Sequence, residues 1–260
     1  MRKHLTFALL AAAAGTAFAA GSAPPSITLS GTVRDFIPGL LVPGSSNPDF
    51  ESGIGGVVYG LVDDTLVGSA PTPSGAYGAP GYISSAASFA EWFGAAAPSK
   101  PYAITLDETA PGSGIYRYAS SSFFPIDGEL LGNQGRVHNY HFTYQIAATF
   151  GYQPGSGQTF TFTGDDDVWV FFDKQLGIDL GGVHGATSQT VNLDTLFGPG
   201  KAEGNYALDF FFAERHTSAS NLQIETSLLL APVPEPSSYA LMAAGLACIG
   251  VLARRRRAAA

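Results

Sequence analysis

The chain has 260 residues, of which 13 are basic and 21 are acidic, so its formal net charge is −8. This acidic balance argues against nucleic acid or anionic lipid as a partner and favours cations. The single cysteine, Cys248, lies near the C-terminus, so no disulfide is expected to hold the main part of the chain together.

The N-terminus has the pattern of a secretory signal peptide. Arg2 and Lys3 form a short basic head, an apolar run covers Leu5–Ala14, and a small-x-small pattern ends at Ala19. This pattern predicts an N-terminal signal helix over residues 1–19, cut by signal peptidase after Ala19. A permanent membrane anchor is the weaker interpretation because the apolar run is short. The sequence therefore predicts export.

Residues 20–231 are predicted to form one all-β domain. Short β-rich runs alternate there with clusters of Gly, Pro, Ser and Asn, which is typical of a β-sandwich. The clearest runs are His138–Phe150, Gln158–Thr163, Val168–Phe172, Tyr206–Glu214 and Leu222–Leu230. One helix is expected over Ser85–Phe93, and the Gly- and Pro-rich stretch Ser52–Gly81 is expected to form loops and edge strands.

Three consecutive aspartates stand between two of these predicted strands. The strand before them alternates apolar and polar residues, whereas Val168–Phe172 is apolar on both faces and is expected to be central. Gly164–Asp167 is therefore predicted to be a turn on a loop at one end of the sandwich. Two interpretations remain open at this point, a calcium site and a solvated turn. A second acidic pair, Asp63-Asp64, lacks a following aromatic strand and is interpreted as surface.

The C-terminal segment, residues 232–260, has three parts. Pro234-Glu235-Pro236 form a break, residues 239–253 are apolar, and four arginines follow, Arg254, Arg255, Arg256 and Arg257. The apolar part is expected to be a short transmembrane helix that anchors the chain transiently in the inner membrane. The whole tail resembles a PEP-CTERM sorting signal, which implies a Gram-negative host and processing by an exosortase. Without both terminal segments, 7 basic and 20 acidic residues remain, a charge of about −13.

Several blocks of the domain occur in an order typical of one family. The blocks are "GTVRDF" at 31, "NPDFE" at 47, "FFPIDG" at 123, "HNYHFTY" at 138, "FTGDDDVWVFFDKQLGIDLGGVH" at 162 and "LDFFFAERHTSASN" at 208. From Gly31 to about Ser227 the chain thereby resembles the fibro-slime domain family of secreted surface and adhesion proteins. That family is similar to the protective-antigen-type β-sandwich, which in yeast flocculins is a calcium-dependent sugar-binding domain.

The resemblance implies a Ca²⁺ site built from two loops. In flocculins, two consecutive aspartates joined by a cis peptide bond bind the metal, and Asp165 and Asp166 occupy that place here. Glu214 stands where flocculins have an asparagine ligand. The backbone carbonyl of His216 is expected to complete the second loop, and Asp167 is a weaker candidate. The aromatic residue with which flocculins grip sugar is missing.

Three further residues near this site receive less specific interpretations. Asn221 and His184 are candidate ligand-binding residues, although a structural turn histidine is the favoured interpretation of His184. The pair Glu214-Arg215 is interpreted as an ion pair or loop brace.

The leading functional hypothesis is a secreted, non-enzymatic protein that binds carbohydrate or exopolysaccharide with Ca²⁺. The alternative is a structural matrix protein in which calcium only braces loops. No metalloprotease helix motif, nucleophile elbow or phosphate-binding glycine loop is found, so a polysaccharide-acting enzyme is a distant third hypothesis.

Overall fold

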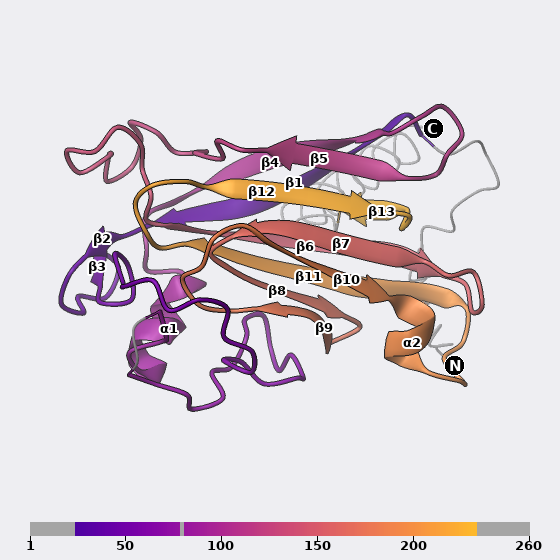
Figure 1. Cartoon of the computed structure of the whole chain (residues 1–260), viewed down its shortest axis with the longest axis horizontal. Helices are drawn as coiled ribbons and strands as arrows, with labels where there is room; N and C mark the ends of the chain where they lie inside the picture. The colour runs from indigo at the N-terminus through magenta and orange to yellow at the C-terminus, as the bar shows by residue number, and fades with distance from the viewer. Residues whose placement is uncertain (1–23, 79–80, 233–260) are drawn as a thin grey trace, which may run out of the picture.

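The computed structural model describes residues 24–78 and 81–232, which form thirteen strands and two short helices (Figure 1). The first strands are β1 Ser26–Asp35, β2 Ile37–Pro38, β3 Ser46–Asn47, β4 Ser99–Glu108, β5 Tyr116–Ser120, β6 Phe142–Tyr152 and β7 Thr159–Asp165. The later strands are β8 Asp167–Phe172, β9 Gln175–Leu180, β10 Thr187–Asn192, β11 Gly204–Glu214, β12 Asn221–Thr226 and β13 Leu230–Pro232. The helices are α1 Ala86–Trp92 and α2 Leu193–Phe197.

Eleven of the strands form one antiparallel sheet that curls around a core. The strand order is β10-β7-β12-β5-β4-β1-β6-β11-β8-β9, and β13 pairs with β6. The two end strands, β9 and β10, contact each other. Across the core, Phe160 and Phe162 of β7 pack against Phe172 of β8 and Phe210 of β11. The two halves of the sheet therefore face each other as in a β-sandwich, and the predicted all-β class is confirmed.

Four of the five predicted runs each contain one strand, with β6 beginning only at Phe142, whereas the run Leu222–Leu230 divides into β12 and β13 with a break at 227–229. The central strand β8 shows why its sequence is apolar on both faces. Val168, Val170 and Phe172 belong to the core between the sheet halves, whereas Trp169 and Phe171 belong to a second core on the outer side. Both faces of the strand are thus buried, as the absence of polar alternation predicted.

The second core lies under a layer of loops that we call the cap, residues 36–78 and 81–97 (Figure 1). The predicted helix is confirmed as α1, with Ser85 as its N-cap and with Phe89 and Trp92 buried. The predicted loop stretch Ser52–Gly81 contains no strand longer than isolated bridges in its described part. It packs against the sheet through Leu61, Val62 and Leu66.

The prediction that Gly164–Asp167 forms a loop is wrong. Strand β7 continues to Asp165 and pairs there with Asn221 of β12, while β8 begins at Asp167 and pairs with Ala213 of β11. Only Asp166 separates the two strands. The chain therefore crosses directly from one half of the sheet to the other. No loop forms, because the backbones of Asp165 and Asp167 are both paired with neighbouring strands.

Both terminal predictions lie outside the described residues. These are the signal helix with cleavage after Ala19, and the apolar tail helix followed by Arg254–Arg257. Between residues 24 and 232, leaving out 79–80, no helix is long and apolar enough to cross a membrane.

Candidate metal and ligand site at the acidic strand crossover

The crossover from β7 to β8 buries all three aspartates. Asp165 is 6% exposed, Asp166 is 4% exposed and Asp167 is 0% exposed. The peptide bond between Asp165 and Asp166 is cis, as the family resemblance implied. A solvated turn is therefore excluded, and each carboxylate must be accounted for by its partners.

Asp165 is held by β12. Its Oδ1 accepts a hydrogen bond of 2.6 Å from the backbone N–H of Asn221, and its Oδ2 accepts one of 2.7 Å from the Asn221 side-chain Nδ2. The predicted ligand-binding residue Asn221 thus uses its backbone N–H and its side-chain Nδ2 to orient a carboxylate. This contact follows directly from the register that places the two residues opposite each other.

Within the part of the chain that the structure describes, Asp166 accepts hydrogen bonds from two backbone N–H groups. The N–H of His184 reaches its Oδ1 at 3.1 Å, and the N–H of Arg215 reaches its Oδ2 at 3.0 Å. Burial, and then the neighbouring charge of Asp167, raise the pKa of Asp166 to about 7. Arg215 and the two N–H groups act in the opposite direction without cancelling these effects. The fold therefore holds this carboxyl where its charged form is disfavoured.

The ring of His184 does not point its nitrogens at the aspartates. Its Nδ1 lies 2.8 Å from the carbonyl oxygen of Gly185, and its Nε2 lies 3.5 Å from that of Leu180. This arrangement agrees with the interpretation as a structural turn histidine. The contribution of His184 to the site comes through its backbone N–H.

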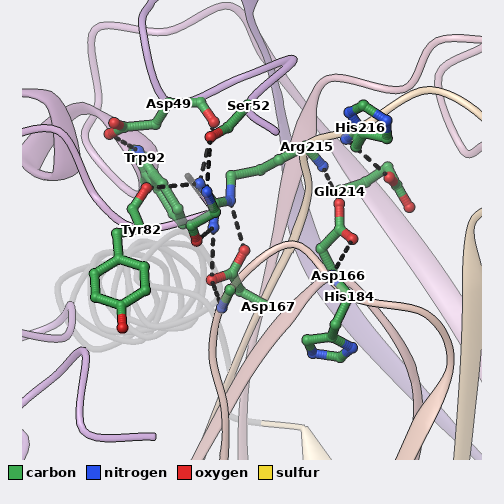
Figure 2. Close-up of polar contacts among 12 residues, drawn as sticks. Asp49, Ser52, Tyr82, Trp92, Asp166, Asp167, His184, Glu214, Arg215 and His216 are labelled. Carbon is green, nitrogen blue, oxygen red and sulfur yellow. Dashed lines mark hydrogen bonds and ion pairs between the residues drawn. The ribbon is translucent and has the colours of Figure 1, made fainter. Parts of the chain in front are cut away.

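Asp167 has a different role from its neighbours. Both of its oxygens contact the guanidinium of Arg215, with Oδ2 2.6 Å from Nε and Oδ1 3.0 Å from Nη2 (Figure 2). The N–H of Gly182 donates to Oδ1 at 2.6 Å. Asp167 thus differs from Asp165 and Asp166 in having its charge neutralised by a buried arginine, which leaves it a weaker candidate metal ligand than its neighbours. The partner of Arg215 in the predicted ion pair is Asp167 and not the adjacent Glu214.

Glu214, at the end of β11, carries the least satisfied carboxylate of this group. The residue is 1% exposed, and its Oε1 accepts a 3.3 Å hydrogen bond from the N–H of His216. Among the described residues its Oε2 is buried and accepts no hydrogen bond of good geometry, although the buried hydroxyl of Ser220 lies close enough to lower the pKa of Glu214 in part. Burial, and then the charges of Asp166 and Asp165, hold the pKa of Glu214 well above its usual range. The predicted ligands Asp165, Asp166 and Glu214 thus lie within electrostatic reach of one another.

Asp165 and Asp166, but not Glu214, line a small pocket. A cavity of about 130 Å³ is lined by Asp165 and Asp166, by His184 and His216, and by the exposed Ile54 of the cap, among others. None of Asp165, Asp166 or Glu214 forms an ion pair with a basic side chain in the part of the chain that the structure describes. The ring Nδ1 of His216 lies 3.6 Å from Glu51 instead.

The donor set suits a hard cation in its chemistry. Calcium takes about six to eight oxygen ligands, including carbonyls and water, in flexible geometry. Across residues 24–78 and 81–232, no group of three or more His, Cys, Asp or Glu side chains is arranged as a ready-made metal site. The buried, unpartnered oxygen of Glu214 and the two neighbouring carboxylates nevertheless supply the negative charge that such an ion requires. The residues present therefore fit calcium by donor type and charge.

The main residue that the sequence interpretation misplaced is Arg215. Arg215 directly follows the run Phe210–Glu214, in which every residue is buried. Its position after this apolar run could have indicated that the arginine is buried too. A buried arginine requires a carboxylate partner, and the neighbouring buried strand end offered Asp167.

Sequence comparisons place the chain in a class. Residues 232–257 match the PEP-CTERM protein-sorting motif, which confirms the predicted sorting signal and indicates export and exosortase processing. The domain itself is similar to fibro-slime-like proteins of Dictyostelium discoideum, which confirms the resemblance seen in the blocks.

The similarity covers most of this chain and only part of its relatives. Protein psiQ is 42% identical over 205 residues, which are 72% of this chain and 20% of psiQ. Protein psiC is 42% identical over 226 residues, which are 79% of this chain and 42% of psiC.

Two solved structures of PA14 domains share a low overall similarity with the chain. A PA14 sugar-binding domain from an RTX adhesin has a TM-score of 0.28 and 13% identity, covering 37% of this chain and 57% of its own. The PA14 domain of the MpAFP antifreeze protein has a TM-score of 0.26 and 11% identity, covering 44% and 65%. At these scores the similarity carries no functional argument.

Proposed function

We propose that the protein is a secreted, non-enzymatic, calcium-dependent carbohydrate-binding or adhesion protein of the cell surface or exopolysaccharide matrix. One observation carries the proposal. Glu214 is fully buried with an unpartnered oxygen beside Asp165 and Asp166, and no basic side chain in the described residues pairs with these three. Buried charge of this kind requires compensation, and a bound cation would provide it.

The proposed ligands are Asp165, Asp166 and Glu214, with the backbone carbonyl of His216. When bound, calcium would supply positive charge and open coordination positions for the hydroxyl groups of a sugar. The chain itself orients the carboxylates through three backbone N–H groups, those of Asn221, His184 and Arg215. The pocket beside them gives a small ligand group access to Asp165 and Asp166. The choice of carbohydrate as the ligand class rests on the fibro-slime resemblance.

Thermal unfolding in calcium and in chelator tests the metal part of the proposal. With calcium at 100 times its Kd, the natural protein is expected to gain about 2.7 kcal/mol, or roughly 5 to 10 °C in Tm. The double variant Asp165→Asn/Asp166→Asn is expected to lose this gain. The matched control is Asp63→Asn/Asp64→Asn, because both of these aspartates are exposed on the cap. A natural protein whose Tm is the same in calcium and in chelator would refute the proposal.

A second candidate is a structural matrix protein in which calcium only braces the fold. The small volume of the pocket favours it, as does the way the carboxylates tie β12, β11 and the loop at His184 together. A glycan array probed in calcium and in chelator separates the two candidates. Calcium-dependent retention of a glycan supports the first, whereas calcium stabilisation without retention supports the second. Turnover of a polysaccharide that is lost in Asp166→Asn would instead indicate an enzyme.

A further inference from the structure

The side chain of Arg215 joins the acidic crossover to the cap. The residue is 0% exposed, and besides its two contacts with Asp167 its guanidinium donates to three cap carbonyls. Nη1 reaches the oxygens of Asp49 at 3.1 Å and Tyr82 at 3.2 Å, and Nη2 reaches that of Gly81 at 2.8 Å. Figure 2 shows this side chain lying between Asp167 and the cap residues. All the hydrogen-bond directions of the fork are thereby used.

An aromatic contact strengthens the same junction. The guanidinium carbon of Arg215 lies 4.7 Å from the ring centre of Trp92, the last residue of α1. The indole N–H of Trp92 donates in turn to the Asp49 side chain at 2.9 Å. A desolvated arginine over a tryptophan face is a favourable cation–π arrangement. The cap is therefore bound to Arg215 by both hydrogen bonds and ring stacking.

The backbone of Arg215 contacts the proposed metal site. Its N–H holds Oδ2 of Asp166 at 3.0 Å, and its carbonyl accepts a 2.6 Å hydrogen bond from the N–H of Glu51 in the cap. The preceding residue is Glu214. Arg215 thus orients the proposed ligand Asp166, directly follows the proposed ligand Glu214, and is anchored in the cap by its side chain.

We infer that Arg215 is a positioning residue that couples the docking of the cap to calcium affinity at the acidic crossover. The inference rests on the proposed function. Arg215 takes Asp167 out of the ligand set by neutralising it, and it holds the main chain that carries Glu214 and orients Asp166. Because coupling between two sites is reciprocal, calcium should also stabilise the docked cap.

Arg215→Lys is the most informative substitution. Lysine keeps the positive charge for Asp167, so the buried carboxylate is not left unpaired, but a single ammonium cannot reproduce the planar fork that reaches three carbonyls. If only charge matters, calcium affinity should not change. If the anchored fork matters, the Kd for calcium should rise roughly tenfold, as expected for residues in one hydrogen-bond network.

Isothermal titration calorimetry measures the Kd for calcium, and hydrogen exchange measures the opening of the cap segments 49–58 and 81–93. The natural protein, Arg215→Lys and two controls are compared in calcium and in chelator. Arg117→Lys is the matched control, because Arg117 is exposed and its side chain pairs with Gln223 and Glu225 of β12, outside the crossover and the cap. Ile224→Val removes a methylene from the core without touching Arg215 or a proposed ligand, and it reports the effect of lowered stability.

The expected result is weaker calcium binding in Arg215→Lys, with faster exchange in both cap segments and unchanged exchange in β6. Equal affinity in the natural protein and Arg215→Lys would overturn the inference and leave the proposed function standing. An equal loss of affinity in Ile224→Val would also overturn it, since a general loss of stability would then suffice. Absence of calcium binding by the natural protein would refute both the inference and the proposed function.

Discussion

Two acidic runs of the same chain have opposite environments. Asp63-Asp64 lies on the cap with both side chains exposed, whereas Asp165-Asp166-Asp167 is buried at the strand crossover. Exposed carboxylates are solvated by water and screened by salt, so they contribute little to stability. Buried ones must be hydrogen-bonded and compensated in charge.

The difference arises from strand pairing and not from local composition. At the crossover, Asp165 pairs with β12 and Asp167 pairs with β11, so both aspartates belong to the sheet. On the cap, the Asp63-Asp64 pair lies between short bridges that leave the side chains in solvent. Of these five aspartates, Asp167 alone forms an ion pair with a basic side chain of the described residues, that of Arg215. The charge left on the remaining carboxylates distinguishes a candidate metal site from an ordinary acidic surface.

The largest effect is expected from removing the buried counter-charge. Asp167→Ala should cost about 3–5 kcal/mol of unfolding free energy, because Arg215 would remain buried without its counter-charge. Asp63→Ala should change the same quantity by no more than about 0.5 kcal/mol, as is usual for exposed positions. Urea unfolding of both variants makes the comparison. Similar losses of unfolding free energy in Asp167→Ala and Asp63→Ala would contradict the view that the buried and the exposed acidic runs differ in their contribution to stability.

A smaller effect on stability is expected from Glu214→Gln, and its sign should differ between chelator and calcium. In chelator, Glu214→Gln should stabilise the protein by about 1 kcal/mol, because the natural carboxyl must either bury its charge beside Asp165 and Asp166 or take up a proton on folding, and the amide does neither. In calcium, the same variant should be less stable than the natural protein, because a proposed ligand is lost. Thermal unfolding in both conditions measures the two differences.

Glu203→Gln is the control for this comparison, since Glu203 is exposed. It should have nearly the same Tm as the natural protein in both conditions. If Glu214→Gln destabilised the protein equally in calcium and in chelator, Glu214 would be a structural residue and not a ligand.

Much of the fold was predictable from periodicity. The alternation in Thr159–Phe162 and its absence in Val168–Phe172 identified a strand with one buried face and a strand with two. The helix α1 followed from the spacing of Phe89, Trp92 and Phe93. These features depend on local sequence, and the core and cap bury the faces that the patterns indicated.

The arrangement of the site was less predictable, because it depends on which strands become neighbours. The family resemblance brought Asp165, Asp166 and Glu214 together. It could not show that Asp167 pairs with Arg215, since that contact joins the start of β8 to the end of β11 and extends into the cap. The triple aspartate also suggested a turn, because three adjacent charges are usually solvated. The register of β11 and β12 overrides that local preference.

The last prediction concerns the pH dependence of stability. In chelator, the stability of the natural protein should fall as the pH rises from about 4 to about 7. The folded protein binds the proton of Asp166 more tightly than the unfolded chain, since its pKa is raised from 3.8 to about 7. Between these two values the native state holds more protons, so the unfolding free energy decreases with increasing pH.

Asp166→Asn should reduce this slope without abolishing it. Burial also raises the pKa of Asp35 to about 6, and this residue lies in a separate hydrogen-bonded group with Asn139 and Leu131. Its contribution has the same sign and remains in the variant. Calcium should flatten the slope of the natural protein, because a bound cation displaces the proton, and calcium affinity should increase between pH 5.5 and 7.5. Melts across this range in chelator and in calcium would measure both effects, whereas the exposed variant Asp63→Asn should follow the natural protein throughout. An identical slope in Asp166→Asn would show that the crossover carboxyl does not titrate in this window.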